Sequence, residues 1–322
     1  MKYCFIINPA SGKSATKEGL ENRIAEECAA AEVECDILYT ERAGDAQRYI
    51  AELRDKYPDE DIRIYACGGD GTLNEAVNGI MALDDRSGVS LGVLPVGTGN
   101  DFVRSFEKSS LFLDISAQIE AQPLDIDLIK CNDFYAVNMI NIGFDCQVVV
   151  KTAEFKHSRF IPSKLAYICG LVATLIKKPG VNMDMSIDGE MPTARKLLLT
   201  TFAKGQFCGG GFHSNPYADL GDGIIDSIVV NNVSRTRFLS LVGSYKKGTH
   251  ICEKNARILK NIRASAYKMM FDRPTEISVD GEIVKVDRID MSCAKGALRF
   301  LVPKGAEALC ALNKIKETSP VL

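Results

Sequence analysis

The sequence contains no tryptophan and only three histidines, at the distant positions 157, 213 and 250. This scarcity argues against a metal site built from histidine. The eleven cysteines include no Cys-x-x-Cys pair, and several fall inside apolar strand or helix patterns. Buried, reduced thiols in a cytosolic protein are therefore a better interpretation than disulfides or zinc.

Strong net charge and long apolar runs are also lacking. A net charge of −3 gives no support to a general nucleic-acid binder. The longest apolar run, residues 165–176, is too short to cross a bilayer. The N-terminus enters a strand pattern directly, so we expect no signal peptide. A chain of 322 residues with 46% hydrophobic residues predicts two domains with buried cores.

What the sequence does contain is a glycine-rich stretch, Ala66-Cys67-Gly68-Gly69-Asp70-Gly71-Thr72-Leu73-Asn74-Glu75. A β-branched and aromatic segment precedes it, and apolar residues at helical spacing follow, which predicts a turn from a strand into a helix. At such a turn, backbone N–H groups and the helix dipole can hold a phosphate, and glycine lets the backbone approach the ligand closely. An ordinary Gly-Asp-Gly turn is the alternative.

Two further polar, glycine-bearing turns, residues 8–14 and 95–101, each follow a predicted strand. Gly12-Lys13-Ser14 is reminiscent of a P-loop, but Ile7 stands where that pattern requires a glycine, so the P-loop is excluded. Strands and helices alternate over this half of the chain, which predicts a parallel, doubly wound sheet whose carboxyl-end loops meet at one edge. Three such turns predict a nucleotide-phosphate site.

The pattern changes near Pro123. From there to residue 302 strand-like segments predominate, among them 134–142, 275–279 and 283–287. This predicts a mainly antiparallel second domain, a β-sandwich or folded sheet. We therefore expect domains at residues 1–123 and 124–302, followed by a C-terminal helix within 303–322 that could pack back on the first domain.

The ordered set of motifs resembles the diacylglycerol kinase catalytic family, which includes soluble bacterial lipid kinases and the sphingosine and ceramide kinases. The resemblance covers nearly the whole chain and implies an α/β nucleotide-binding domain, similar to that of the NAD kinases, followed by a β-sandwich domain. The matching motifs are Asn8-Pro9-Ala10-Ser11-Gly12, Gly68-Gly69-Asp70-Gly71-Thr72-Leu73-Asn74-Glu75, Pro95-Val96-Gly97-Thr98-Gly99-Asn100-Asp101, Asn141-Ile142-Gly143-Phe144-Asp145, Gly209-Gly210-Gly211 with Pro216-Tyr217-Ala218, Asp222-Gly223 and Val279-Asp280-Gly281-Glu282.

The resemblance implies that ATP, with Mg²⁺, is bound by the three turns. Asp101 resembles a carboxylate of the nucleotide or magnesium network, and a carboxylate that favours a helix N-terminus is the alternative. For Thr40 the alternative is a plain residue at the end of a strand. The implied nucleotide-binding residues are Asn8, Pro9, Ala10, Ser11, Gly12, Thr40, Gly68, Gly69, Asp70, Gly71, Thr72, Leu73, Asn74, Glu75, Gly97, Thr98, Asn100 and Asp101.

Asp280-Gly281 lies between two strand-like segments and is a good two-residue hairpin turn on its own. The resemblance implies that this turn presents the catalytic carboxylate. Phosphoryl transfer to an alcohol needs a group that accepts the hydroxyl proton. By similarity that group is Asp280 or Glu282; we favour Asp280, with Glu282 as the base or as its magnesium-linked partner.

The loop at residues 219–224 resembles one that holds a structural Mg²⁺ in the family. The implied ligands are Asp219, Asp222 and the carbonyl of Ile224, and oxygen ligands suit this cation. A solvated Asp-Gly turn is the alternative. Asp127 aligns with a carboxylate that links this metal to the active site through water, although Asp125 is predicted to lie on the same strand face.

A lipid acceptor must be taken from a membrane. The apolar segment 165–176 is flanked by basic residues in 156–160 and 177–178, which suits reversible docking on an anionic membrane. A buried core helix is the alternative. The loop Phe207-Cys208-Gly209-Gly210-Gly211-Phe212 could form a wall of the lipid site. We expect a lipid acceptor and transient membrane contact, no nucleic acid, and leave a homodimer open.

The sequence thus predicts a cytoplasmic lipid kinase, peripheral at the membrane during turnover, that acts in phospholipid metabolism. It would transfer the γ-phosphate of ATP to a lipid hydroxyl, on diacylglycerol or a related glycerolipid. A kinase of a soluble acceptor is an alternative, because Gly-Gly-Asp-Gly-Thr also occurs in NAD kinases and phosphofructokinases. A nucleotide-binding regulatory protein without turnover is a third interpretation.

Overall fold

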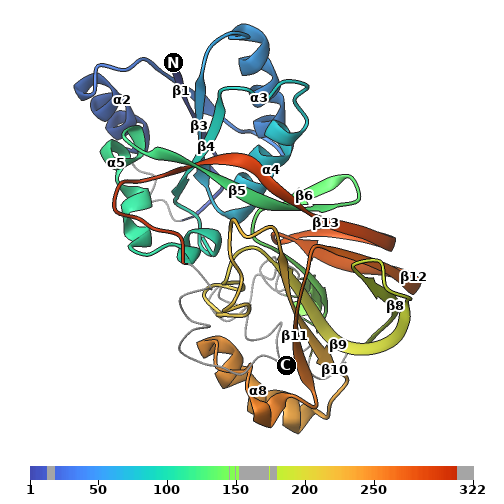
Figure 1. Cartoon of the computed structure of the whole chain (residues 1–322). Helices are drawn as coiled ribbons and strands as arrows, with labels where there is room; N and C mark the ends of the chain where they lie inside the picture. The colour runs from blue at the N-terminus through green and yellow to red at the C-terminus, as the bar shows by residue number, and fades with distance from the viewer. Residues whose placement is uncertain (13–18, 145, 149, 152–173, 175–179, 310–322) are drawn as a thin grey trace. The chain divides into compact units, whose positions relative to one another are not determined.

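The structure is a computed structural model that describes residues 1–12, 19–144, 146–148, 150–151, 174 and 180–309 (Figure 1). The chain divides into two compact units. The first comprises Met1–Leu128, Leu220–Asp222 and Ala294–Leu309, and the second contains Ile129–Asp219 and Gly223–Cys293. The predicted boundaries at 123 and 302 differ from this division, because the chain returns to the first unit near its end.

A parallel sheet forms the centre of the first unit. Its strands pair in the order β2-β1-β3-β4, so the chain continues from β2 to the far side of β1. Helices α2 and α5 lie on one side of these strands and α3 and α4 on the other, as a doubly wound sheet requires (Figure 1). The elements are β1 (Lys2–Ile7), α2 (Leu20–Ala30), β2 (Cys35–Tyr39), α3 (Asp45–Lys56), β3 (Ile62–Gly68), α4 (Asp70–Met81), β4 (Val89–Pro95) and α5 (Ile115–Ile119).

Burial on both faces explains why β1, β3 and β4 are nearly continuous apolar runs, whereas the edge strand β2 is only partly buried. Phe5 and Tyr65 are completely buried, and their rings stack with centroids 4.6 Å apart. Leu20 and Ile24 of α2 pack against the same cluster. The predicted alternation of strands and helices is thus found from β1 to β4.

The segment after β4 departs from the regular alternation of strands and helices predicted for this half of the chain. It forms two 3-10 helices, η1 (Phe102–Ser105) and η2 (Ser109–Leu113), before the short α5. Phe102, Phe106 and Phe112 gather around Phe300, whose strand pairs in parallel with β4. The sequence predicts a C-terminal helix within residues 303–322. Residues 303–309 contain no helix, and residues 310–322 lie outside the described residues.

The second unit is built from antiparallel strands, as expected. They pair in the order β11-β10-β9-β7-β12-β13, with β8 paired to both β9 and β12. Alternate residues, such as Ile140 and Ile142, point into one apolar core. The elements are β5 (Gln122–Cys131), β6 (Phe134–Ala136), β7 (Met139–Gly143), β8 (Val181–Ile187), β9 (Thr193–Ala203), β10 (Ile225–Asn231), α8 (Arg235–Lys247), η3 (Glu253–Asn255), β11 (Leu259–Ala264), β12 (Ala266–Val279) and β13 (Glu282–Val302), of which β5 and β13 run through both units.

Within the described residues, no helix combines the length and the apolar character needed to cross a membrane. The predicted membrane-docking segment, 165–176 with its basic flanks at 156–160 and 177–178, lies outside the described residues, apart from position 174.

Candidate active site

The three glycine-rich turns of the first unit meet at the carboxyl ends of β1, β3 and β4. The Asn8 N–H donates to the Cys67 carbonyl oxygen at 3.0 Å, and the Asn8 side-chain amide donates to the Thr72 hydroxyl at 3.0 Å. The Gly97 N–H donates to the Gly68 carbonyl oxygen, also at 3.0 Å. The turns therefore form one hydrogen-bonded cradle next to the β1–β3 switch point, where ligands of doubly wound sheets bind.

Two glycines of this cradle cannot be replaced without moving the backbone. Gly12 has φ +70°, and a Cβ there would lie 1.8 Å from the Val96 carbonyl oxygen. A Cβ on Gly97 would lie 2.3 Å from the Gly69 Cα. The first and third turns thus approach their neighbours as closely as only glycine permits, which also leaves their backbone uncovered by side chains.

Helix α4 begins at Asp70, directly after β3 and the extended Gly69, and in the described chain no side chain caps this end. The first N–H groups of a helix have no intrahelical partner, and the helix dipole makes this end positive. An uncapped helix start beside these turns has the donors and the partial charge that suit a phosphate.

Asp70 and Asp101 fix the third turn. Asp70 Oδ1 accepts hydrogen bonds from the N–H groups of Asp101 at 2.8 Å and Phe102 at 3.3 Å. Burial raises the pKa of Asp70 above its ordinary value, and these amides act in the opposite direction. Asp101 is buried and directly precedes η1, and its Oδ1 lies 3.4 Å from the Arg104 Nε. Asn100, at φ +51°, donates to two carbonyl oxygens of the same turn.

The other predicted nucleotide residues divide into exposed and buried ones. Pro9, Ala10, Gly12 and Thr98 are exposed, and Ser11 and Gly71 are partly exposed. The remaining side chains are buried or hydrogen-bonded to other parts of the first unit. Glu75 Oε1 accepts from the Ala46 N–H at 2.8 Å and so joins α4 to α3. Leu73, Asn74 and Thr40 are buried.

Arg104 is a candidate that the motifs did not indicate. Its Nη2 donates to the Gly99 carbonyl oxygen at 3.2 Å, and its side chain is about half exposed. This holds a guanidinium at the third turn, where it could pair with a phosphate. In the sequence, the sign that could have indicated Arg104 is its basic side chain three positions after Asp101, the last residue of the third turn.

In the second unit, Asp280 occupies the first position of the turn between β12 and β13. Asp280 has φ +48° and Gly281 φ +100°, the left-handed pair that a tight hairpin requires. The Asp280 carboxylate accepts three backbone hydrogen bonds, from the N–H groups of Val137 at 2.8 Å, Asn138 at 3.0 Å and Met139 at 2.7 Å. The side chain is buried, whereas that of Glu282 is exposed.

These three hydrogen bonds correct the prediction of one strand at 134–142. The chain instead forms β6 and β7 with a break at Val137 and Asn138. Their N–H groups turn to the distant carboxylate rather than to a neighbouring strand. Asp280 is therefore both a candidate base and the residue that shapes this bend.

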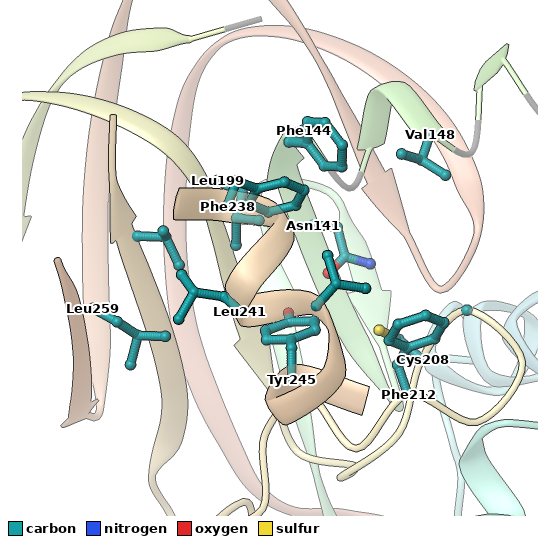
Figure 2. A pocket seen from close by; sticks show the side chains of 13 residues that line it. Asn141, Phe144, Val148, Leu199, Cys208, Phe212, Phe238, Leu241, Tyr245 and Leu259 are labelled. Carbon is teal, nitrogen blue, oxygen red and sulfur yellow. The ribbon is translucent and has the colours of Figure 1, made fainter. Parts of the chain in front are cut away.

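An apolar pocket of about 70 Å³ lies in the same unit between the sheet, α8 and the loop around Cys208 (Figure 2). Phe238 of α8 packs on Phe144 with ring centroids 4.4 Å apart. Asn141 of β7 is the one polar side chain apart from Tyr245 and Cys208, and among the described residues its buried Oδ1 has no hydrogen-bond partner. The lining residues are Asn141, Phe144, Val148, Leu199, Cys208, Gly209, Phe212, Val230, Phe238, Leu241, Val242, Tyr245 and Leu259.

Comparison with known proteins gives two family matches. Residues 2–131 match the "Diacylglycerol kinase catalytic domain", and residues 138–302 match the "YegS C-terminal NAD kinase beta sandwich-like domain". A protein of Staphylococcus aureus (strain Mu3 / ATCC 700698) named "Putative lipid kinase" is 31% identical over 272 residues, which are 82% of this chain and 85% of the relative. The chain belongs to the diacylglycerol kinase family.

Solved structures show the same fold. A "putative diacylglycerol kinase" from Bacillus anthracis str. Sterne superposes with a TM-score of 0.73 at 23% identity, covering 94% of this chain and 97% of that one. An NAD kinase from Archaeoglobus fulgidus, solved in complex with ATP, gives a TM-score of 0.50 at 11% identity and covers 98% of each chain. At these identities the likeness concerns the fold alone.

The metal loop expected from the diacylglycerol kinase resemblance does not fit a metal ion here. The Lys204 side chain is completely buried, and its Nζ donates to the carbonyl oxygen of Ile224 at 2.7 Å. That oxygen is one of the three implied ligands. Across the described residues, no three His, Cys, Asp or Glu side chains are grouped so that they could hold a metal.

Asp127 and Asp125, the two carboxylates considered for the link to that metal, differ in burial. Asp127 is buried, its Oδ1 accepts from the Gly296 N–H at 2.8 Å, and its own N–H donates to the Leu220 carbonyl oxygen at 2.7 Å. Asp125 is exposed. Asp127 therefore connects β5, the end of β13 and the 220–222 segment within the first unit.

Proposed function

We propose that this member of the diacylglycerol kinase family transfers the γ-phosphate of MgATP to a hydroxyl group of a lipid, diacylglycerol or a related glycerolipid. The family supports the kinase activity, and the observation that carries the lipid acceptor is the apolar pocket beneath α8. A kinase of a soluble metabolite has no use for such a pocket.

The first unit supplies the nucleotide site. Its cradle suits a triphosphate because the Gly12 and Gly97 turns bring backbone close to the ligand and the start of α4 supplies N–H donors. Arg104 adds a positive charge at the third turn. Mg²⁺ enters with the nucleotide as part of the substrate. Asp70 acts indirectly, since it holds the third turn in place.

The second unit supplies the carboxylates for the acceptor. A new bond forms between the acceptor oxygen and the γ-phosphorus, the bond to ADP breaks, and the hydroxyl proton passes to Asp280 or Glu282. Asp280 is immobilised by three amides, which suits the orientation of a hydroxyl group. Glu282 is exposed and is free to change rotamer.

The pocket is proposed to hold one end of the acceptor. Its walls are aliphatic and aromatic, and its volume of about 70 Å³ has room for only a few carbon atoms without side-chain movement. We therefore expect a chain to enter by displacing flexible lining groups. The buried Asn141 Oδ1 would accept a hydrogen bond from a hydroxyl or amide group of the lipid.

Helix α8 is proposed to contact the membrane while the lipid is taken up. One side of it lines the pocket through Phe238, Leu241 and Tyr245. The opposite side exposes Leu239, and the helix ends in Lys246 and Lys247 without any acidic residue. An apolar residue between cationic groups suits an anionic lipid surface.

A Val242→Phe variant tests the pocket, because the larger ring would fill it. We expect an increase in KM of about tenfold or more for a long-chain diacylglycerol in mixed micelles, with the KM for MgATP unchanged. Leu239→Phe is the matched control on the exposed side of the same helix. An unchanged lipid KM for Val242→Phe, with the variant shown to be folded by circular dichroism, would exclude this pocket as the acceptor site.

A further inference from the structure

The Lys204 side chain of the second unit is completely buried. Lys204 directly follows β9, and the register that pairs Ala203 with Asp226 places it beside the start of β10. Its own N–H donates to the Asn138 carbonyl oxygen at 2.9 Å, which fixes its backbone. The side chain then runs through the interior to the Ile224 carbonyl oxygen, where the Nζ donates at 2.7 Å. It is among the largest side chains that are completely buried.

A lysine is seldom fully buried, because an ammonium group taken out of water needs compensating partners. Here the chain places that group on a carbonyl oxygen in the loop 219–224, where Asp219 and Asp222 supply negative charge nearby in the sequence. The carbonyl oxygen and the carboxylates of this loop are the groups that bind cations, and here the cation is an ammonium group of the protein itself.

The ammonium group and a metal ion compete for this position. A Mg²⁺ ion binds oxygen at about 2.0–2.1 Å, so a metal on the Ile224 carbonyl oxygen would lie less than about 5 Å from the Lys204 Nζ. Two positive groups at this separation repel one another, and the completely buried Lys204 side chain has little water around it to weaken the repulsion. The loop can hold one of them.

We propose that the Lys204 ammonium group is the resident cation of the loop 219–224 and that this loop binds no Mg²⁺. The protein then keeps the loop in shape at any magnesium concentration. Its need for Mg²⁺ reduces to the ion that accompanies ATP. This last consequence rests on the proposed kinase function, whereas the metal content of the loop does not.

Titration of the nucleotide-free protein with MnCl₂, followed by electron paramagnetic resonance, tests the proposal without any activity measurement. Mn²⁺ prefers the same oxygen ligands as Mg²⁺. We expect no site with a dissociation constant below about 1 mM in the natural chain. A stoichiometric site that is lost in Asp222→Asn would overturn the proposal.

Lys204→Met removes the charge but retains most of the side-chain volume. We expect a lower midpoint of thermal unfolding and a gain of one Mn²⁺ site, with partial recovery of the midpoint in about 10 mM MgCl₂. Adding Asp222→Asn to Lys204→Met should remove both the Mn²⁺ site and the recovery of the midpoint in MgCl₂. Lys260→Met, at an exposed lysine on β11, is the control and should show neither. A folded Lys204→Met protein without a metal response would show that Lys204 is not what takes the place of the metal.

If Lys204→Met does not fold, the titration of the natural chain still decides. Mn²⁺ binding that depends on Asp222 contradicts the proposal, and its absence agrees with it. Kinase activity is measured separately in excess MgATP. Loss of activity without Mn²⁺ binding in the natural chain would refute the proposed function and leave the inference on Lys204 intact.

Discussion

Replacement of Asp280 by asparagine is the usual test of a catalytic carboxylate, and here we predict that it also destabilises the fold. Asp280 Oδ1 accepts from Asn138 and Met139, and Oδ2 accepts from Val137. An asparagine has one oxygen and one NH₂ group. If the oxygen keeps the first two hydrogen bonds, the NH₂ group faces the Val137 N–H, donor against donor.

The magnitude follows from these contacts. One buried amide without its acceptor costs about 1–3 kcal/mol, and the two remaining hydrogen bonds lose their charged acceptor, at about 0.5–1 kcal/mol each. Asparagine tolerates the left-handed backbone at φ +48°, so the turn itself adds little. The free energy of unfolding should therefore fall by about 2–5 kcal/mol.

Urea unfolding, followed by circular dichroism, measures this change. Glu282→Gln is the matched control, because Glu282 is exposed in the same hairpin, and its stability should stay within about 0.5 kcal/mol of the natural chain. An equally small effect of Asp280→Asn would refute the role assigned to the three amides. If the predicted loss occurs, an inactive Asp280→Asn protein says nothing about proton transfer unless its folded fraction is known.

Three further predictions follow from other contacts. Burial lowers the pKa of His250 to about 4, so as the pH falls the unfolded chain takes up the proton before the folded chain does, and the free energy of unfolding should fall by about 3 kcal/mol between pH 6.5 and pH 4. In urea titrations, a His250→Asn variant should lack this part of the pH dependence. An identical change of unfolding free energy with pH in both proteins would contradict the prediction. Gly97→Ala should weaken ATP binding at least tenfold in calorimetry, because its Cβ would meet Gly69, while Gly243→Ala, with open space around it, should bind ATP normally. Reversing the charges of Lys246 and Lys247 to glutamate should reduce co-sedimentation with vesicles of anionic phospholipid about tenfold and leave neutral vesicles unaffected; unchanged sedimentation would exclude α8 as the membrane contact.

The sequence was sufficient where structure depends on local signals. Strands β1, β3 and β4 carry nearly continuous apolar runs because both faces of the sheet are covered there. Gly12 and Gly97 mark turns whose close approach to neighbouring backbone only glycine permits. Parallel strands then bring the turns to one edge. The meeting of the three turns could thus be predicted before any contact was known.

Contacts between distant residues were not accessible in this way. Residues 134–142 have a continuous strand pattern, and the break between β6 and β7 is caused by a carboxylate that comes 142 positions after Asn138. Glu75 belongs to the glycine-rich motif, yet it bonds to the start of α3. The return of Ala294–Leu309 to the first unit likewise depends on pairing with β4.

Lys204 illustrates the limit of motif transfer. The carboxylates of the metal loop are present in the order that the family resemblance implies. The residue that changes their chemistry lies twenty positions before Ile224, directly after β9, and no motif includes it. Burial and the hydrogen bond to the Ile224 carbonyl oxygen, rather than the motif, decide what the loop can hold.

The central claim is tested most directly by transfer of labelled γ-phosphate from MgATP into mixed-lipid micelles, followed by identification of the labelled product. We predict one labelled glycerolipid, whose formation is reduced in Val242→Phe and normal in Leu239→Phe. Labelled lipid should be absent when the micelles are replaced by a soluble diol. Tight ATP binding with no labelled lipid in any micelle, or label transferred to the soluble acceptor instead, would contradict the claim that this protein is a lipid kinase.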